Sequence, residues 1–254
     1  MIRGIYAAAS SMVSSYRRQH IVANNLANAS TTGYKQDLPV PSDFPNLSVV
    51  GADGARKEFS SAWDAIGSIG AGIDLSEILV DVSQGDVIET GNALDLAITG
   101  PGYFSVQTLN GTLYTRDGTF FRDASGNLTR ADGGLLLGDD GPIQVGEGDI
   151  VVDGDGAVSV DGQVSGRIRL VSFDPQERLI KVGNNYLTPE DPNAQVQPSD
   201  AAAISQGFLE RSNVDLNRAM IEMMSALRSY EANQKMITIQ DQTLGLTVNE
   251  VGKV

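Results

Sequence analysis

The fold is decided at the start of the chain, by residues 1–35, "MIRGIYAAASSMVSSYRRQHIVANNLANASTTGYK". In this stretch, residues that are almost all apolar recur at alternating intervals of three and four. They are Ile2, Ile5, Ala9, Met12, Tyr16, Gln19, Ala23 and Leu26. A sustained repeat of 3.5 residues is typical of coiled-coil helices. We therefore expect residues 1–35 to form a long coiled-coil helix that ends near Gly33, after the polar run Ser30-Thr31-Thr32.

The other end of the chain, residues 214–254, has the same repeat. Its members are Met220, Met223, Leu227, Tyr230, Gln234, Ile237, Asp241, Leu244, Val248 and Val251. Isolated polar positions such as Gln234 and Asp241 can fix the register of a coiled coil. The sequence thus predicts two terminal coiled-coil helices packed together. The alternative is two amphipathic helices that pack on one globular core.

Three asparagines, Asn24, Asn25 and Asn28, lie opposite the repeat in the first helix. The same outer face carries Gly4, Ala7, Ser10, Ser11 and Ser14. A solvated helix face usually carries Lys and Glu, which favour solubility and helix formation. We therefore expect this face to be buried against further chains, with the asparagines as polar contacts to neighbours. Fraying of the last helical turns is the alternative.

The middle of the chain has a different pattern. Residues 36–75 contain Pro39, Pro41 and Pro45 without a sustained period, which predicts an extended linker. Residues 76–213 predict a β-rich domain inserted between the helices, so the expected fold class is α+β. Its candidate strands include 94–99, 103–108, 112–117, 119–123, 127–130 and 134–138, and further runs are DIVVD, AVSV and RIRLVSF. Asn110-Gly111, Asp117-Gly118 and Ser125-Gly126 have the chemistry of hairpin turns.

Charge is unevenly distributed along the 254 residues. The formal net charge is −14. The first 36 residues carry four basic side chains and no acid, and residues 214–254 carry four basic and five acidic side chains. The middle therefore holds a charge of −17, obtained by taking +4 and −1 from −14. An acidic middle argues against nucleic acid as a partner.

The composition also excludes several kinds of active site. Cysteine is absent and His20 is the single histidine. This removes cysteine nucleophiles, Ser-His-Asp triads and zinc sites built from Cys and His. The stretch "VDGDGAVSVDG" (152–162) suggests calcium, but it lacks the ligand spacing of an EF-hand loop and fits strands joined by Asp-Gly turns. We expect no catalytic residue, cofactor or metal.

Three segments resemble one known family in the same order. "IVANNLANASTTGYK" (21–35) is similar to the N-terminal signature of bacterial flagellar rod and hook axial proteins. "VSQGDVIETGNALDLAITGPGYFSVQ" (82–107), continued by "YTRDGTFFRDASGNL" (114–128), resembles their central β motif. "GFLERSNVDLNRAMIEMMSALRSYEANQKMI" (207–237) resembles their C-terminal helix signature.

The resemblance implies a structural subunit of the flagellar basal-body rod, which polymerises and transmits motor torque to the hook. Departures such as "ALRSYEANQKM" favour a proximal-rod type over a distal-rod type. The implied partners are other copies, other rod and hook axial proteins and the flagellar type III export apparatus. Export without a cleaved signal peptide is expected, because the N-terminus lacks a compact apolar block. Neither nucleic acid nor direct membrane insertion is expected, since no stretch approaches 18 consecutive apolar residues.

The resemblance also assigns interface positions. The residues that we expect at subunit interfaces are Ile5, Met12, Tyr16, Asn24, Asn25, Leu26, Asn28, Gly33, Asn213, Met223, Leu227, Tyr230, Asn233, Ile237 and Leu244. Two other functions compete with this one. The chain could be a non-stoichiometric exported assembly factor of the rod or hook. It could also be a rod-associated wall hydrolase with paired carboxylates, but the middle is already taken up by the family-like β motifs.

Overall fold

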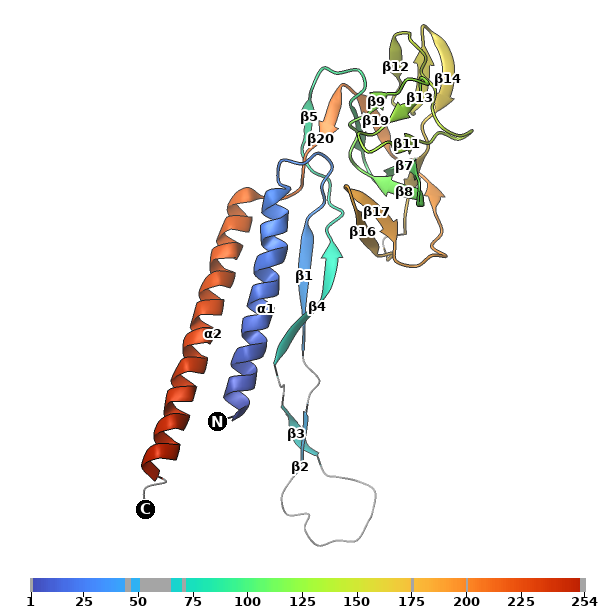
Figure 1. The fold of residues 1–254 in the computed structure, drawn as a ribbon. Helices are drawn as coiled ribbons and strands as arrows, with labels where there is room; N and C mark the ends of the chain where they lie inside the picture. The colour runs from blue at the N-terminus through green and yellow to red at the C-terminus, as the bar shows by residue number, and fades with distance from the viewer. Residues whose placement is uncertain are drawn as a thin grey trace, which may run out of the picture. The chain divides into compact units, whose positions relative to one another are not determined.

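The computed structural model describes residues 2–43, 47–50, 65–69, 72–174, 176–199 and 201–251. It confirms the α+β prediction, because an N-terminal and a C-terminal helix flank a mostly β region (Figure 1). The chain divides into two compact units. The helical unit comprises residues up to 24, residues 39–78 and residues from 217 onward, and the β unit comprises residues 25–38 and 79–216.

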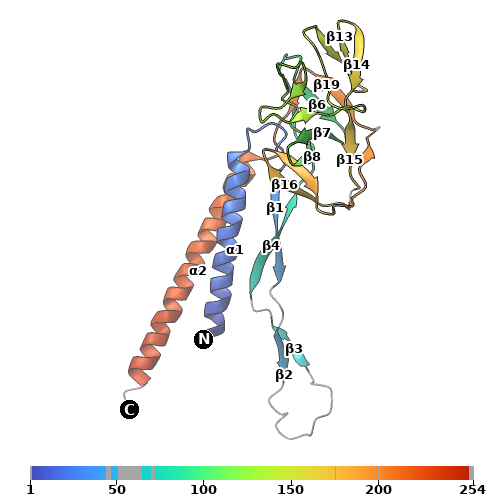
Figure 2. The same ribbon diagram turned by 45° about the vertical axis from the view of Figure 1, so that its right-hand side comes forward.

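The two helices are α1 (Ile2–Ala27) and α2 (Leu216–Val251), and Figures 1 and 2 show them side by side. Helix α1 ends earlier than the sequence predicted. From Asn28 onward, bonds between residues three apart replace the helical pattern: Asn28 N donates to Asn25 O (3.2 Å) and Ala29 N donates to Leu26 O (3.3 Å). Asparagine favours such local turns over helix, which explains the early end.

The least exposed side chains of α2 are spaced by four and three residues. They are Ala219, Met223, Ala226, Tyr230, Asn233, Ile237, Gln240 and Leu244, with Glu222 half-buried beside them. Met223, Tyr230, Ile237 and Leu244 belong to the predicted repeat. The alternate members Met220, Leu227, Gln234 and Asp241 are exposed instead. The covered face of α2 is therefore rotated away from the predicted repeat, toward small and amide side chains.

Helix α1 meets α2 through small residues. Ser15 Oγ donates to Ser229 Oγ over 3.1 Å. A Cβ atom on Gly4 would lie 2.5 Å from the amide nitrogen of Gln240, so the close approach there depends on glycine or on movement of Gln240. The prediction that Gly4 faces away from α2 is thus wrong. Small side chains allow two helices to approach closely, which explains why larger residues lie elsewhere.

Strand β4 (Ile73–Val80) covers a second side of α1. The guanidinium of Arg17 pairs with Asp74 (2.8 Å) and donates to Leu75 O (3.1 Å). The part of α1 that neither α2 nor β4 covers forms an exposed strip. Tyr16 is on that strip and is 52% exposed, although the repeat predicted it for the helix contact.

The predicted linker contains paired strands. β1 (Asp37–Asp43) pairs with β4, and β2 (Leu47–Val50) pairs antiparallel with β3 (Ala65–Ile69). Pro39 and Pro41 fit a two-stranded sheet, because residues two apart present their nitrogens to the same edge and that edge can be the unpaired one. Residues 44–46, 51–64 and 70–71 of the predicted linker lie outside the described residues.

The β unit consists of several small sheets and one large one. The large sheet has the order β16 (Leu179–Gly183), β17 (Tyr186–Pro189), β8 (Gly111–Thr115), β7 (Tyr103–Thr108), β11 (Leu135–Leu136), β10 (Leu128–Thr129) and β9 (Phe121–Arg122). β15 (Leu170–Ser172) pairs with β7 and with β18 (Gln197–Pro198). β12 (Ile150–Val152), β13 (Ala157–Val160) and β14 (Gln163–Arg167) form a meander. β6 (Leu96–Thr99) pairs with β19 (Ala203–Gln206), and β5 (Val87–Glu89) pairs with β20 (Phe208–Glu210).

Two apolar clusters fill the β unit. The larger cluster centres on Phe104 and Phe120, whose rings meet edge to face at 5.3 Å between centroids. The smaller cluster is built around Tyr103 and Val171. Every member of both clusters comes from residues 79–216. Alternation of apolar and polar residues along short strands is what places these side chains on the inside.

The predicted turns differ in outcome. Ser125-Gly126 joins the paired strands β9 and β10, as predicted, and Gly126 has a φ of 81°. Asn110-Gly111 also joins a hairpin, but Gly111 pairs with Thr108, so the turn is shifted back by one residue. Asp117-Gly118 joins no hairpin, because the strands before and after it, β8 and β9, do not pair with each other. A Cβ atom on Gly118 would lie 1.6 Å from Leu96 O. Glycine serves there as a point of close backbone approach.

The acidic stretch 152–162 forms turns between strands. Val160 pairs with Gln163, so Asp161 and Gly162 form a two-residue loop. Both have positive φ, at 51° and 79°. Two such residues in sequence define the turn that suits a twisted hairpin. The structure therefore agrees with the preferred interpretation of strands joined by Asp-Gly turns.

Candidate functional site

Residues 25–38, named here the docked segment, are held in the β unit mainly by polar contacts. Asn25 is one example. Its amide nitrogen donates to Asp37 O (2.8 Å), and its amide oxygen accepts from Asp37 N (2.9 Å) and the Tyr34 hydroxyl (3.0 Å). Asn25 is 6% exposed. The side chain therefore closes a loop in its own chain. The contact of Asn25 with neighbouring subunits stays a prediction.

A buried ionic cluster lies at the centre of this contact. Lys35 Nζ is 2.5 Å from Glu210 Oε1 and donates to Ser83 O (2.7 Å). Arg116 Nη1 is 3.2 Å from Glu210 Oε2. The side chains of Lys35 and Glu210 are 1% and 0% exposed. Burial lowers the pKa of Lys35, and the adjacent Glu210 carboxylate opposes that shift.

Glu210 accepts from three donors. The third donor is the backbone nitrogen of Gly85, 3.0 Å from Oε1. Arg116 also donates to Ile98 O (3.3 Å) and Gly100 O (2.6 Å). A buried charge is tolerated when its lone pairs or protons are satisfied in this way. The cluster joins residues that are 175 positions apart, Lys35 and Glu210.

A second ion pair holds the end of the docked segment. Lys181 Nζ is 2.8 Å from Asp37 Oδ1 and lies 3.8 Å from the centroid of the Tyr34 ring. Cations over tyrosine faces are attracted by the ring quadrupole. Burial lowers the pKa of Lys181 while Asp37 opposes the shift, and burial raises the pKa of Tyr34. The segment is thus fixed at two charged points.

Gly33 and Asn213 complete the contact. Gly33 has a φ of 63°, and a Cβ atom there would lie 2.3 Å from Asp117 N. Its nitrogen donates to Glu210 O (2.7 Å). The Asn213 amide accepts from Gln36 N (2.8 Å) and donates to Asp81 O (3.0 Å). Both residues were predicted at subunit interfaces, and the structure uses both within the chain.

The helices present uncovered apolar side chains. On α1 these are Tyr6, Val13 and Tyr16. On α2 they are Leu216, Met220, Ile221, Met224, Leu227, Met236, Ile239, Leu246 and Val248. Leu227 is 43% exposed. Single exposed apolar residues are ordinary, but a succession along one helix marks a surface for another protein.

The predicted interface residues fall into three classes of exposure. Tyr16, Asn24 and Leu227 are exposed, and Asn25 and Gly33 are buried. The intermediate class holds Ile5, Met12, Leu26, Asn28, Asn213, Met223, Tyr230, Asn233, Ile237 and Leu244. The sequence pattern did not predict a site role for Lys35, Glu210, Arg116 or Lys181. One signal was available, because Glu210 directly follows the apolar pair Phe208-Leu209 in a short strand.

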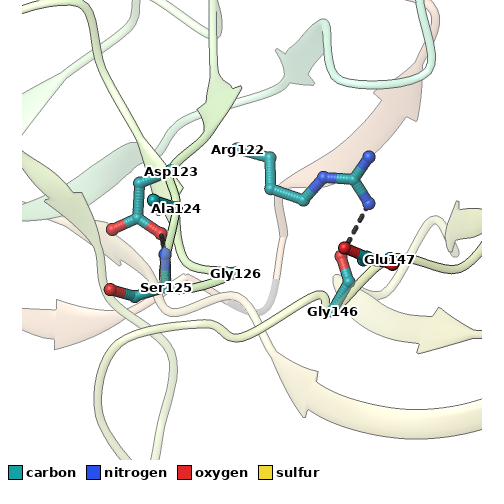
Figure 3. Close-up of a pocket in the computed structure, with 7 residues that line it drawn as sticks. All are labelled: Arg122, Asp123, Ala124, Ser125, Gly126, Gly146 and Glu147. Atoms are coloured by element: carbon teal, nitrogen blue, oxygen red, sulfur yellow. Dashed lines mark hydrogen bonds between the residues drawn. The ribbon is translucent and has the colours of Figure 1, made fainter.

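A hollow of about 520 Å³ lies between two loops of the β unit (Figure 3). Arg122 donates across it to Gly146 O (2.6 Å), and Asp123 accepts from Ser125 N (2.9 Å). The Asn127 and Ser125 hydrogen bonds lower the pKa of Asp123. These polar groups hold the loops of the hollow in place, and this is the role that their contacts support.

Within the described ranges, acidic and histidine side chains nowhere gather in threes as a metal site would need. Neither described helix carries an apolar stretch of the length that a bilayer crossing requires.

Models of three protein families match the chain. Residues 5–35 match the flagella basal body rod protein family. Residues 97–165 match the flagellar hook protein FlgE/F/G D1 domain. Residues 205–250 match the flagellar basal body rod FlgEFG protein C-terminal family. The three matches include most of α1, much of the β unit and most of α2.

Several relatives match over almost their whole length. The flagellar basal-body rod protein FlgG of Bacillus subtilis is 34% identical, over 98% of this chain and 99% of the relative. The flagellar basal-body rod protein FlgF of Caulobacter vibrioides is 33% identical over the full length of both. The flagellar hook-basal body complex protein FlhO of Bacillus subtilis is 30% identical, also over both whole chains. The chain belongs to the family of flagellar basal-body rod proteins, which are structural subunits rather than enzymes.

Proposed function

We propose that this rod protein polymerises with copies of itself and with other rod and hook axial proteins into the shaft that carries motor torque to the hook. The observation that carries the proposal is the uncovered apolar surface of α1 and α2. Burial of each large apolar side chain contributes about 1.5–3 kcal/mol. A chain that exposes such residues along both helices gains this free energy when other subunits cover them.

The helices support a coiled-coil arrangement within and between chains. The spacing of four and three residues among the least exposed positions of α2 is the spacing of a coiled-coil seam. We assign Met223, Tyr230 and Ile237 to the contact within the chain. We assign Tyr16 and Leu227 to contacts with other chains, because both are exposed. Many parallel helix contacts would give a shaft the stiffness that torque transmission needs.

Placement in the proximal rod and export by the flagellar type III apparatus, without a cleaved signal, are further parts of this proposal. Relatives named FlgG and FlgF have nearly the same sequence identity to the chain, so identity does not favour either. The proximal assignment is based only on the departures from the distal-rod pattern. Quantitative peptide mass spectrometry of purified hook–basal bodies tests it. A copy number well below that of the most abundant rod protein supports the proximal rod, and a comparable number contradicts it.

The assembly surface is tested by adding charge to it. The double variant Met224→Lys/Leu227→Lys places two cations on the exposed apolar side of α2. We expect loss of the protein from purified basal bodies and loss of motility, because buried unpaired charges are costly. Gln242→Lys is the matched control, since it adds a cation at an exposed polar position of the same helix.

Circular dichroism of the purified double variant must show the secondary structure of the unaltered chain. Normal incorporation and swimming of that variant would exclude this side of α2 as an assembly surface.

A further inference from the structure

The docked segment is attached to the β unit without sharing its apolar core. Neither apolar cluster contains a residue from 25–38. Tyr34 is buried, but its ring is covered by the Lys181 ammonium. The remaining anchors are hydrogen bonds and ion pairs, among them Thr32 Oγ1 to Asp117 (2.8 Å) and Asn185 to Thr32 O (2.6 Å). The core of the β unit is therefore complete without this segment.

The acceptor side of the ionic cluster is likewise complete without the segment. Arg116, Glu210 and the Gly85 nitrogen all belong to residues 79–216, and their mutual contacts do not involve residues 25–38. Lys35 is the member that the docked segment adds. Its four-carbon stem places the ammonium beside a carboxylate already held by two donors.

We infer that residues 79–216 form a preformed docking site for the docked segment, and that Lys35 and Glu210 are the latch that closes it. The site recognises four features of this segment. They are the glycine at the close approach, Gly33, the aromatic ring of Tyr34, the cation of Lys35 and the anion of Asp37. Opening the latch releases the segment while the β core stays folded. The consequence of the latch rests on the proposed function: the latch would control whether the end of α1 is held in place before the protein assembles.

The geometry predicts that the two halves of the latch are unequal. Loss of the Lys35 charge leaves Glu210 paired with Arg116. Loss of the Glu210 charge leaves Lys35 and Arg116 buried together without their shared anion. A buried charge that has lost its counter-ion costs more free energy than a buried charge that has lost one partner but keeps another. Glu210→Gln should therefore release the segment more than Lys35→Met.

Hydrogen exchange of the full-length, unassembled protein tests the latch. Peptides covering residues 28–38 are compared with peptides covering β7 and β8, in the unaltered chain, Lys35→Met and Glu210→Gln. We expect exchange in 28–38 to rise at least about tenfold in Glu210→Gln and less in Lys35→Met, with β7 and β8 unchanged. Lys235→Met removes an exposed lysine of α2 and serves as the control, with no change in either region.

Three results would overturn the inference. The first is unchanged exchange in 28–38 in both variants. The second is faster exchange in β7 and β8 as well as in 28–38, because the cluster would then be part of the core rather than a separable latch. The third is a segment that is already unprotected in the unaltered chain. Because the protein is unassembled throughout, none of these outcomes depends on whether the rod assignment is correct. If Glu210→Gln does not fold, Lys35→Met still decides between the outcomes.

Discussion

The β unit and the helical unit differ in how far one chain can bury its apolar side chains. In the β unit, Phe104, Phe120 and Leu136 are fully buried by residues of the same unit. In the helical unit, Tyr6, Met224 and many similar side chains remain exposed. Helix α2 has 36 residues, but its buried side chains among those described are the small Ala219 and Ala226.

This difference separates two sources of stability. The β unit has the closed core that a domain needs to fold alone. The helical unit has two long helices and paired strands, but few large side chains between them. In proteins most helix stability comes from the packing of an apolar face. Further subunits would supply this packing, so we expect the helical unit to be the less stable of the two in the free chain.

The largest expected effect is in the β core. Phe104→Ala removes a fully buried ring and its edge-to-face contact with Phe120. We expect the free energy of unfolding of the β unit to fall by about 3–5 kcal/mol, because the change leaves a cavity as well as lost burial. Denaturant unfolding followed by tyrosine fluorescence or near-ultraviolet dichroism measures it.

Phe121→Ala is the matched control, since Phe121 lies in the same region of the chain but is exposed. We expect it to cost less than about 1 kcal/mol. Equal losses in the two variants would mean that the apolar cluster around Phe104 does not dominate the stability of the β unit.

A smaller effect is expected in the helical unit. Val22 is buried on α1, whereas Val13 on the same helix is exposed. If α1 is packed in the free chain, Val22→Ala should cost about 2 kcal/mol and Val13→Ala less than about 0.5 kcal/mol. Thermal loss of the helical dichroism signal at low protein concentration measures both.

The pair of valine variants also sharpens the comparison between the units. Identical melting of the two variants would show that α1 has no fixed packing before assembly. A loss from Val22→Ala as large as that from Phe104→Ala would contradict the lower stability that we assign to the helical unit.

The sequence predicted the class of fold because periodicity reports it directly. Repeats of 3.5 residues indicated α1 and α2, and short alternating runs indicated β6, β7 and β8. The repeat did not identify which helix face is covered, because it was recognised from large apolar side chains and small residues do not contribute to it. The observed contact uses Gly4, Ser15 and Ser229, which are all small residues.

The ionic cluster could not have been found by pattern alone. Lys35 and Glu210 are 175 residues apart, and pairing across such a distance depends on the complete fold. The same limit applies to Asn25, which was assigned to an outer face by helical geometry. Helical geometry did not show that the chain turns back after α1 and brings Asp37 to the asparagine amide.

The smallest expected effect concerns acid and the docked segment. Partial burial acts to raise the pKa of Asp81, but hydrogen bonds from Gln36 Nε2 (2.8 Å) and Ser83 N (2.9 Å) hold it below its ordinary value. A carboxyl whose folded pKa is lowered favours folding above its unfolded pKa, and this contribution is lost as the pH falls through the folded pKa. Attachment of residues 36–38 should therefore weaken below about pH 4.

Asp81→Asn isolates this contribution because it removes the titrating group and keeps an acceptor oxygen. Exchange of peptides covering residues 28–38 should depend less on pH between 5 and 3 in the variant than in the unaltered chain. Gln36→Ala should have the same effect in weaker form, since it removes one donor that lowers the pKa. Identical pH dependence in all three proteins would contradict the role of Asp81. The effect should be the smallest of the three because Asp81 is partly exposed and its interactions are screened by water.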